Sequence, residues 1–332
     1  MILINENEKQ ILKDFTFIDL FAGIGGFRVA LESFGAKCIF SSEIDKFAIE
    51  TYFENYNEIP SGDITKIKEE DIPNHDILCA GFPCQPFSIS GKQKGFEDTR
   101  GTLFFDIARI VKYHTPKILF LENVKNFETH DGGRTLKVIK ETLKELGYKV
   151  YYKVLNASKF GIPQKRERIY IVAFRSDIIK KDFIFPNETL QNVSLENFLS
   201  NNIEEIERFI INREDITIRQ KDIDKALSKN VYYNSLRIGE VALGRQGERI
   251  YHPKAHAITL SADGGGIGAK TGLYYINGLV RRLSPNECRK IMGYPDSFKI
   301  VSSDSKAHKQ FGNSVVIDVL QYIIKEIIKS IY

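Results

Sequence analysis

The sequence contains no tryptophan, only four cysteines and no long apolar run, and the last two shortages exclude whole classes of protein. The cysteines form no C-x-x-C pair, which argues against a disulfide scaffold and a zinc site and favours a reduced, cytoplasmic setting. They are Cys38, Cys79, Cys84 and Cys288. No apolar stretch approaches the roughly 18 residues of a membrane span, and the polar segment from Met1 to Gln10 is unlike a secretory signal. We therefore expect neither a metal nor a membrane partner.

The composition that remains is that of an ordinary globular protein. The 332 residues are 42% hydrophobic and 27% charged, which suits about two domains with a full core. The formal net charge of +4 decides little, because a weakly basic protein binds nucleic acid, a small anion or neither.

The first half of the chain alternates apolar, β-rich runs with stretches of helical periodicity. Strands are predicted over residues 15–21, 37–43, 75–82, 117–124, 149–157 and 168–174, and helices over 27–35, 45–56, 103–113 and 134–146. This alternation predicts an α/β fold with a mostly parallel, Rossmann-like sheet and helices on both faces. Ligands of such sheets bind beyond the carboxyl ends of the strands. The strand ends to inspect are Phe21, Glu43, Phe82 and Glu122.

The character of the sequence changes after about residue 177. Residues 187–235 show no clear period, and short strands with Gly-rich turns follow them. A helix between 313 and 331 is expected to pack back on the first domain. Ser284, Pro285, Glu287 and Gly293 predict a short capped helix. We expect residues 1–190 and 285–332 to form one domain, and 191–284 a smaller, loop-rich, β-containing domain.

The glycine-rich segment "FAGIGGF", residues 21–27, joins the first strand to the first helix. Gly23 and Gly25 allow close approach of the backbone to a ligand, and Glu43 follows about twenty residues later, where an acid can bind ribose hydroxyls. A tight turn without ligand and a dinucleotide site are the alternatives. Arg28 stands where a dinucleotide site has its third glycine, which suits a cofactor with adenosine but no pyrophosphate.

Cys84 lies in "GFPCQPFSISGKQKGFEDTRG", residues 81–101, where two prolines restrict its backbone. A lone cysteine is more often an inert, buried residue, but flanking prolines argue against a continuing strand. The cationic loop after it holds Ser90, Lys92 and Arg100. It is either a solvated surface loop or a lid over an anionic substrate.

Charged residues at two further strand ends are candidates for acid–base chemistry. Glu122 in "LENV" has apolar neighbours, and burial there raises the pKa of a carboxyl and suits it to proton donation. A structural acid that caps the next segment is the alternative. Arg166 and Arg168 in "QKRERIY" precede an apolar strand, so at least one guanidinium is expected to turn inward.

Five segments in order resemble motifs of the bacterial cytosine-C5 DNA methyltransferase family, and the likeness covers nearly the whole chain. They are "DLFAGIGGF", "GFPCQPFS", "ENV", "QKRERIY" and "FGNSVV". The resemblance implies methyl transfer from S-adenosyl-L-methionine to C5 of a flipped cytosine in duplex DNA, with S-adenosyl-L-homocysteine as the product. It also implies a catalytic, cofactor-binding domain over 1–190 and 285–332, and a target recognition domain and hinge over 191–284.

The resemblance assigns roles to single residues. Cys84 would add to C6 of the ring, Glu122 would protonate N3, and Arg168 would bind O2 with Arg166 in support. Cofactor contacts are implied for Phe21, Gly23, Gly25, Glu43, Asp63, Leu103 and Asn313. DNA contacts are implied for Ser90, Lys92, Arg100, Gln246 and Arg249, with Gln246 and Ser90 filling the gap left by the flipped base.

Further stretches are similar to a member of the family that methylates the inner cytosine of GCGC. Asp263 and Arg245 depart from that member's residues in segments that touch DNA, so the target sequence stays open. The expected partner is double-stranded DNA in the bacterial cytoplasm, with a monomeric protein and a separately acting restriction endonuclease. A tRNA cytosine methyltransferase, a nicotinamide-dependent oxidoreductase and a catalytically silent DNA-binding homologue are the alternatives.

Overall fold

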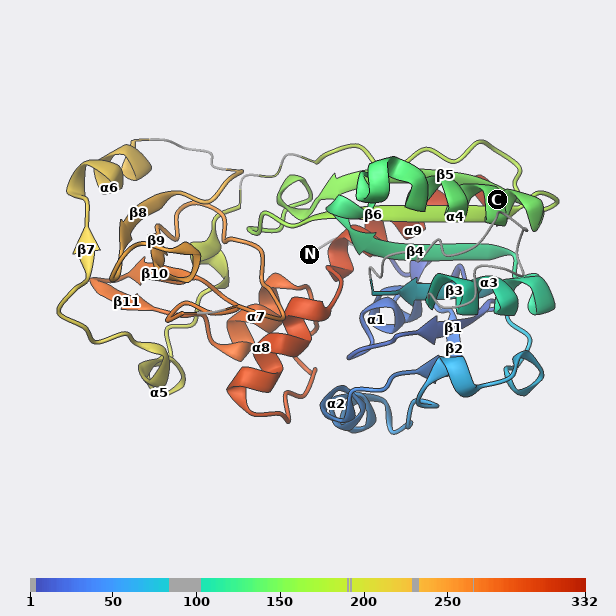
Figure 1. Ribbon diagram of the computed structural model, residues 1–332, viewed down its shortest axis with the longest axis horizontal. Coiled ribbons are helices and arrows are strands. Elements are labelled where there is room, and N and C mark those ends of the chain that lie inside the picture. The colour runs from blue at the N-terminus through green and yellow to red at the C-terminus, as the bar shows by residue number, and fades with distance from the viewer. Residues whose placement is uncertain (1–3, 84–102, 190, 192, 229–232, 265) are drawn as a thin grey trace. The chain divides into compact units, whose positions relative to one another are not determined.

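The computed structural model describes residues 4–83, 103–189, 191, 193–228, 233–264 and 266–332 (Figure 1). It divides into two compact units. The first unit comprises Ile2–Leu155, Glu167–Pro186 and Leu320–Tyr332, and the second comprises Asn156–Arg166 and Asn187–Val319. Four of the predicted site residues lie outside the described residues, namely Cys84, Ser90, Lys92 and Arg100.

The first unit is built on a six-stranded sheet with the strand order β2-β1-β3-β4-β6-β5. Its strands are β1 (Thr16–Leu20), β2 (Lys37–Ser42), β3 (Ile77–Gly81), β4 (Ile118–Val124), β5 (Tyr148–Asn156) and β6 (Glu167–Arg175). Its helices are α1 (Gly26–Glu32), α2 (Lys46–Tyr56), α3 (Leu103–His114), α4 (Arg134–Glu145) and most of α9 (Ile317–Ile331). The pairs β1–β2, β1–β3 and β3–β4 are parallel, whereas β6 is antiparallel to β4.

The two faces of this sheet follow from the two-residue period of its strands. Ile18, Leu78 and Leu119 stand in register, and the same hydrophobic cluster contains buried residues of α3 and α4. One residue further along β4, Phe120 packs instead against Phe27 of α1, with their ring centroids 5.1 Å apart. Both faces are therefore covered by helices, as the sequence predicts.

The register also brings the carboxyl ends of the strands into one row. Leu20 pairs with Ser42 on one side and with Ala80 on the other. Gly81 pairs in turn with Glu122. The chain leaves β1 toward β2 on one side of the sheet and β3 lies on the other, so the topological switch point falls between β1 and β3. In folds of this kind that crevice is where ligands bind.

The second unit contains a five-stranded sheet with the order β11-β10-β9-β8-β7. Its strands are β7 (Thr217–Ile218), β8 (Arg237–Glu240), β9 (Arg249–Tyr251), β10 (Leu273–Ile276) and β11 (Leu279–Arg281). Its helices are α5 (Ile203–Ile206), α6 (Gln220–Leu227), α7 (Pro285–Ile291) and α8 (Asp304–Asn313). Ile238, Ile250 and Leu273 are fully buried in its small core.

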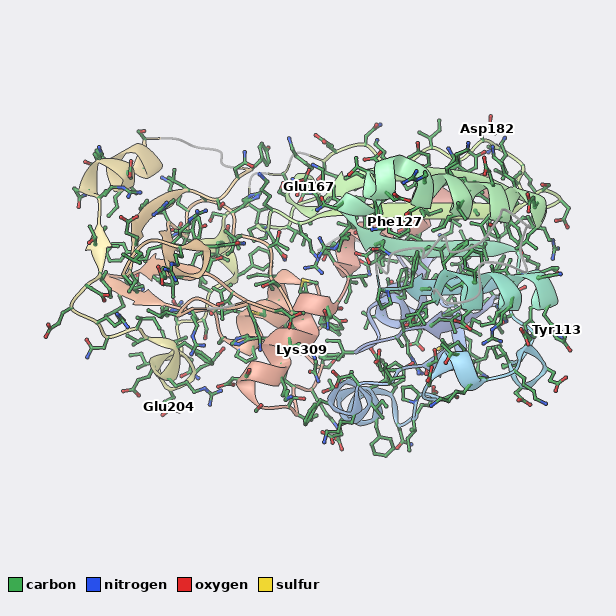
Figure 2. All side chains as sticks on the ribbon, in the orientation of Figure 1. Tyr113, Phe127, Glu167, Asp182, Glu204 and Lys309 are labelled. Atoms are coloured by element: carbon green, nitrogen blue, oxygen red, sulfur yellow. The ribbon has the colours of Figure 1, made fainter. Side chains whose placement is uncertain are left out.

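Large apolar side chains form the core of the first unit, and many of its charged side chains lie at the surface. Figure 2 shows Phe127 inside the first unit, where it is 1% exposed, and Asp182 at its periphery. No helix of the described residues is both long and apolar enough to cross a membrane. The cysteines of the described part, Cys38, Cys79 and Cys288, are free and buried.

The structure confirms the α/β class, the mostly parallel sheet and the capped helix after Ser284. The sequence prediction missed α8, whose ten residues include few apolar side chains. The compact units also divide the chain elsewhere than the expected functional domains, because α7 and α8 belong to the unit that contains β7–β11. One reason is the buried ion pair between Arg281 and Glu287, 2.6 Å long, which joins β11 to α7. The functional boundaries remain a prediction.

Helix α7 offers a test of local stability. The Ser284 hydroxyl caps the helix by accepting from the Glu287 amide, whereas Ser303, at the N-cap of α8, makes no side-chain cap bond. We expect Ser284→Ala to lower the free energy of unfolding by about 1–2 kcal/mol, measured by urea denaturation. Ser303→Ala is the matched control and should change it by less than about 0.5 kcal/mol. Equal losses in the two variants would contradict the capping role.

Candidate active site

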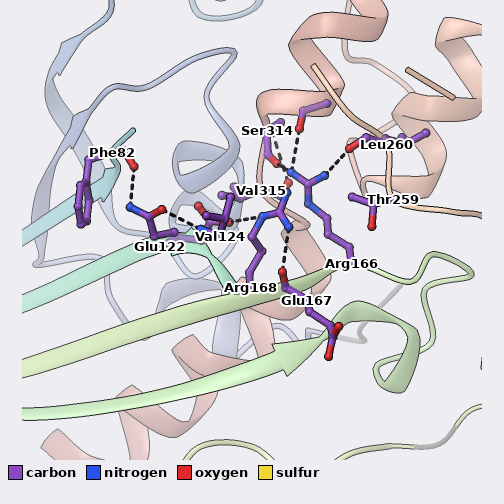
Figure 3. Close-up of polar contacts among 12 residues, drawn as sticks. Phe82, Glu122, Val124, Arg166, Glu167, Arg168, Thr259, Leu260, Ser314 and Val315 are labelled. Atoms are coloured by element: carbon purple, nitrogen blue, oxygen red, sulfur yellow. Dashed lines mark hydrogen bonds and ion pairs between the residues drawn. The ribbon is translucent and has the colours of Figure 1, made fainter. Parts of the chain in front are cut away.

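The backbone that leads into the Cys84 segment is anchored at the end of β4. Asn123 is 3% exposed, and its Nδ2 donates to the carbonyl oxygen of Phe82 at 2.8 Å (Figure 3). Its Oδ1 accepts from the Val124 amide at 2.8 Å, so both ends of the side-chain amide are used. This asparagine fixes the chain two residues before Cys84. Sequence reasoning missed it, although it stands in the "ENV" motif beside Glu122.

Glu122 and Arg168 form an ion pair at the same edge of the sheet. The Arg168 Nε lies 3.1 Å from Glu122 Oε1, and the two side chains are 16% and 11% exposed (Figure 3). The pairing of β4 with β6 explains the contact, because Val124 lies opposite Arg168. Arg168 Nη1 also donates to the Glu167 carbonyl oxygen at 2.8 Å. The predicted acid and one predicted arginine therefore meet in a nearly buried site.

Arg166 serves a different set of partners, all within the second unit. Its guanidinium donates to the carbonyl oxygens of Leu260 at 2.8 Å, Gly312 at 2.9 Å and Ser314 at 2.5 Å (Figure 3). The side chain is buried, and these acceptors come from segments far apart in sequence. Arg166 thus joins the "QKRERIY" and "FGNSVV" motifs through the backbone.

The glycine-rich loop after β1 is bound to the end of β2 through Glu43. Glu43 Oε2 accepts from the Gly23 amide at 2.7 Å, and Oε1 accepts from the amides of Ile44 and Asp45, both at 2.8 Å. A carboxylate can accept about four hydrogen bonds, so this one retains some capacity for hydroxyl groups of a ligand.

Three residues of this loop have left-handed backbones. They are Phe21, Gly23 and Gly25, with φ of 57°, 56° and 84°. A bulky residue such as Phe21 rarely adopts this conformation, and such strain is concentrated at functional sites. A Cβ added at Gly23 would meet no atom within 4 Å, so its backbone faces open space.

Two further cofactor candidates belong to the first unit. Asp63 accepts from the hydroxyl of Thr65 at 2.8 Å and from its amide at 3.1 Å. These bonds lower the pKa of the Asp63 carboxyl below its ordinary value and favour its ionised form. Leu103 is the first residue of α3 and is partly buried. Asn313 ends α8 in the second unit and is exposed.

Asp19, on β1 directly before the glycine-rich loop, is a buried acid that sequence reasoning did not select. It is 1% exposed, and its Oδ2 has no hydrogen-bond partner among the described residues. Burial raises the pKa of this carboxyl well above its ordinary value, which favours the protonated form. An acidic residue inside an apolar strand was the available signal.

The DNA-contact candidates of the second unit, Gln246 and Arg249, lie close to each other in sequence, and Arg249 begins β9. Gln246 is exposed and Arg249 is partly buried. Arg245 and Asp263, which differ from the residues of the family member that methylates GCGC, are both exposed. Arg245 and Asp263 stand in residues 245–251 and 261–266, the two stretches that the family resemblance assigns to DNA. The Gly268 amide donates to the Gly247 carbonyl oxygen at 2.7 Å, and Gly266 also lies against Gly247, so these two stretches lie side by side.

Gly312 of the "FGNSVV" motif has a purely structural reason to be glycine. The backbone of Ser261 and Ala262 passes so close to its Cα that no Cβ fits. Within the described residues, no group of three His, Cys, Asp or Glu side chains could hold a metal ion.

Comparison with known proteins assigns the chain to a family. The model of the C-5 cytosine-specific DNA methylase family matches residues 15–329. The type II methyltransferase M.HhaI of Haemophilus parahaemolyticus is 56% identical over 99% of this chain and 98% of its own length. M.HaeII of Haemophilus aegyptius is 43% identical over 96% of this chain and 95% of its own.

A solved structure agrees at the level of the fold. The S. pombe Dnmt2 methyltransferase superposes with a TM-score of 0.71 at 18% identity, covering 93% of this chain and 97% of that one. The chain belongs to the C-5 cytosine-specific DNA methylase family and is a DNA cytosine-C5 methyltransferase. The resemblance found in the five motifs is thereby confirmed.

The two arginines of "QKRERIY" should respond differently to the same substitution. Arg166→Lys cannot reach three carbonyls with one ammonium group, so we expect the free energy of unfolding to fall by about 2–4 kcal/mol. Arg168→Lys is the matched variant two residues away and should lower turnover by about tenfold or more, with a smaller loss of stability. Urea denaturation and methyl-transfer rates measure the two effects. These assignments would be contradicted if Arg168→Lys were the less stable variant and Arg166→Lys the less active one.

Proposed function

We propose that this protein uses S-adenosyl-L-methionine to methylate C5 of a flipped cytosine in duplex DNA, through a covalent bond between Cys84 and C6. The proposal rests on the single row of polar residues at the carboxyl ends of the strands. In that row Glu43 follows β2, Glu122 lies near the end of β4 beside Arg168, and Asn123 anchors the backbone before Cys84. The recognition domain and hinge over 191–284 are part of this proposal.

The residues at the switch point fit a cofactor with an adenosine and an amino-acid part. Phe21 presents an aromatic ring for adenine, Glu43 keeps acceptor capacity for ribose hydroxyls, and Asp63 can accept from the adenine amino group. Gly23 and Gly25 line the methionine end, and Leu103 and Asn313 are further cofactor-binding candidates. When bound, S-adenosylmethionine supplies the electrophilic methyl group and leaves as S-adenosylhomocysteine.

Cys84 and Glu122 together make C5 of cytosine nucleophilic. The Cys84 thiolate adds to C6, and Glu122 gives a proton to N3, which turns the ring into an enamine. Once C5 carries the methyl group, a base removes the C5 proton, the Cys84–C6 bond breaks to regenerate the thiolate, and N3 returns its proton to Glu122. Ring methylation and release of one proton balance the reaction.

The ion pair of Glu122 with Arg168 sets a condition on this chemistry. A guanidinium at 3.1 Å favours the charged carboxylate, whereas proton donation needs the acid form. A cytosine O2 that accepts from Arg168 would take over that hydrogen bond and leave Glu122 facing N3. Arg166 supports the arrangement by holding the backbone immediately before Arg168.

DNA recognition is assigned to residues 245–251 and 261–266 of the second unit and to the Cys84 segment. Gln246 and Ser90 fill the gap left by the flipped base, while Lys92, Arg100 and Arg249 contact phosphates or bases. Similarity to type II methyltransferases supports a role in restriction–modification, beside a separately acting endonuclease. The target is GCGC or a sequence altered from it through Arg245 and Asp263.

The covalent step can be trapped with duplex DNA that carries 5-fluorocytosine at the target position. The fluorine cannot leave as a proton does, so the wild-type protein with S-adenosylmethionine should form an adduct that survives denaturing electrophoresis. Cys84→Ser should form none, and Glu122→Gln should form it at least tenfold more slowly at unchanged DNA affinity. An adduct that persists in Cys84→Ser would contradict the role of this thiol.

The target sequence can be determined by bisulfite sequencing. The protein is expressed in a bacterial host without its own cytosine-C5 methylation, and the host DNA is treated with bisulfite. Only the inner cytosine of GCGC sites should remain unconverted. Methylation confined to another sequence would reject GCGC, and Arg245→Gly with Asp263→Tyr then tests whether these two positions altered the target. The inactive Cys84→Ser variant is the control, and its DNA should be converted throughout.

A further inference from the structure

Tyr56, the last residue of α2, is hydrogen-bonded to the glycine-rich loop. Its hydroxyl donates to the carbonyl oxygens of Ile24 at 3.4 Å and Gly25 at 3.2 Å. Neither the motifs nor the family assignment singles out this side chain. The bonds link a residue 31 positions along the chain to the segment that holds Gly23.

The loop and the tyrosine are shaped to each other at Gly25. A Cβ added there would lie 2.5 Å from the Tyr56 hydroxyl oxygen and 2.6 Å from its ring. The φ of Gly25 is 84°, so a side chain is disfavoured by conformation as well as by space. Gly23 differs, because an added Cβ there meets no atom within 4 Å. Gly25 is therefore required because Tyr56 occupies the space of a side chain, whereas Gly23 faces open space.

The ring of Tyr56 is held in place by Arg28. The guanidinium carbon of Arg28 lies 4.3 Å from the ring centroid, within the range of a cation–π contact. Arg28 is buried and is itself fixed by Glu58, at 2.6 and 3.1 Å, and by Glu32 at 2.8 Å. The residue that replaces the third glycine of a dinucleotide motif therefore supports Tyr56.

We propose that Tyr56 is a positioning residue that preorganises the loop for S-adenosylmethionine. Three residues within five positions of this loop have left-handed backbones, so ordering the loop costs conformational entropy. A loop that was not held in advance would lose this entropy when the cofactor binds. The Tyr56 bonds fix the carbonyls of Ile24 and Gly25 toward α2 before binding. Preorganisation of this kind appears as ligand affinity and not as chemical rate.

This inference rests on the proposed cofactor, and Tyr56→Phe tests it. The substitution keeps the ring and its contact with Arg28 and removes only the hydroxyl. We expect the dissociation constant for S-adenosylmethionine, measured by calorimetry on the full chain, to rise about 3- to 10-fold. The KM for S-adenosylmethionine should rise in parallel, while kcat at saturating cofactor and the KM for DNA stay unchanged.

Tyr52→Phe is the matched control on the same helix. The Tyr52 hydroxyl accepts from Arg28 Nη1 at 3.0 Å, so its loss should lower the melting temperature and leave cofactor affinity within about twofold. A wild-type protein that binds no S-adenosylmethionine would reject the proposed function itself. Wild-type affinity in Tyr56→Phe, or equal weakening in Tyr52→Phe, would overturn the positioning role while leaving the proposed function intact.

Discussion

The register of the parallel strands is the constraint on which the rest of the first unit depends. Leu20 pairs with Ser42 and Ala80, and Gly81 with Glu122, so the ends of β1, β2 and β3 lie level with Glu122 of β4. Parallel pairing allows each strand to deliver one polar residue to the same edge, where the backbone also changes direction. A slip by one residue would turn Glu122 to the opposite face of the sheet.

Buried arginines connect the motifs to one another. Arg28 joins α1 to the segment after α2 through Glu58, and Arg281 joins β11 to α7 through Glu287. Arg166 binds three backbone carbonyls of its own unit. Charged groups are tolerated in a protein interior when they are paired or hydrogen-bonded. Charged residues in these motifs therefore shape the architecture as well as the chemistry, and only Arg168 is paired with the proposed acid.

Much of the fold followed from local patterns in the sequence. The predicted strand over 15–21 is Thr16–Leu20 in the structure, and the predicted helix over 103–113 is Leu103–His114, because apolar periodicity records which face is buried. Helix α8 was missed because its buried side includes His308 and Gln310, which are polar and so do not contribute to an apolar periodicity. For the site, the strand-end rule selected Phe21, Glu43 and Glu122. It could not reveal that Asn123 binds the Phe82 carbonyl, since that contact joins residues 41 positions apart.

By itself the sequence determined the class of fold, the order of the motifs and the residue types available for chemistry, since these depend on periodicity and on local backbone preference. Only the tertiary structure decided which of those residues face one another. In the structure Arg168 pairs with Glu122, Arg166 donates to backbone carbonyls, and Tyr56 lies against Gly25. The physical reason is that such contacts depend on strand register and helix packing between distant segments, which local patterns do not record.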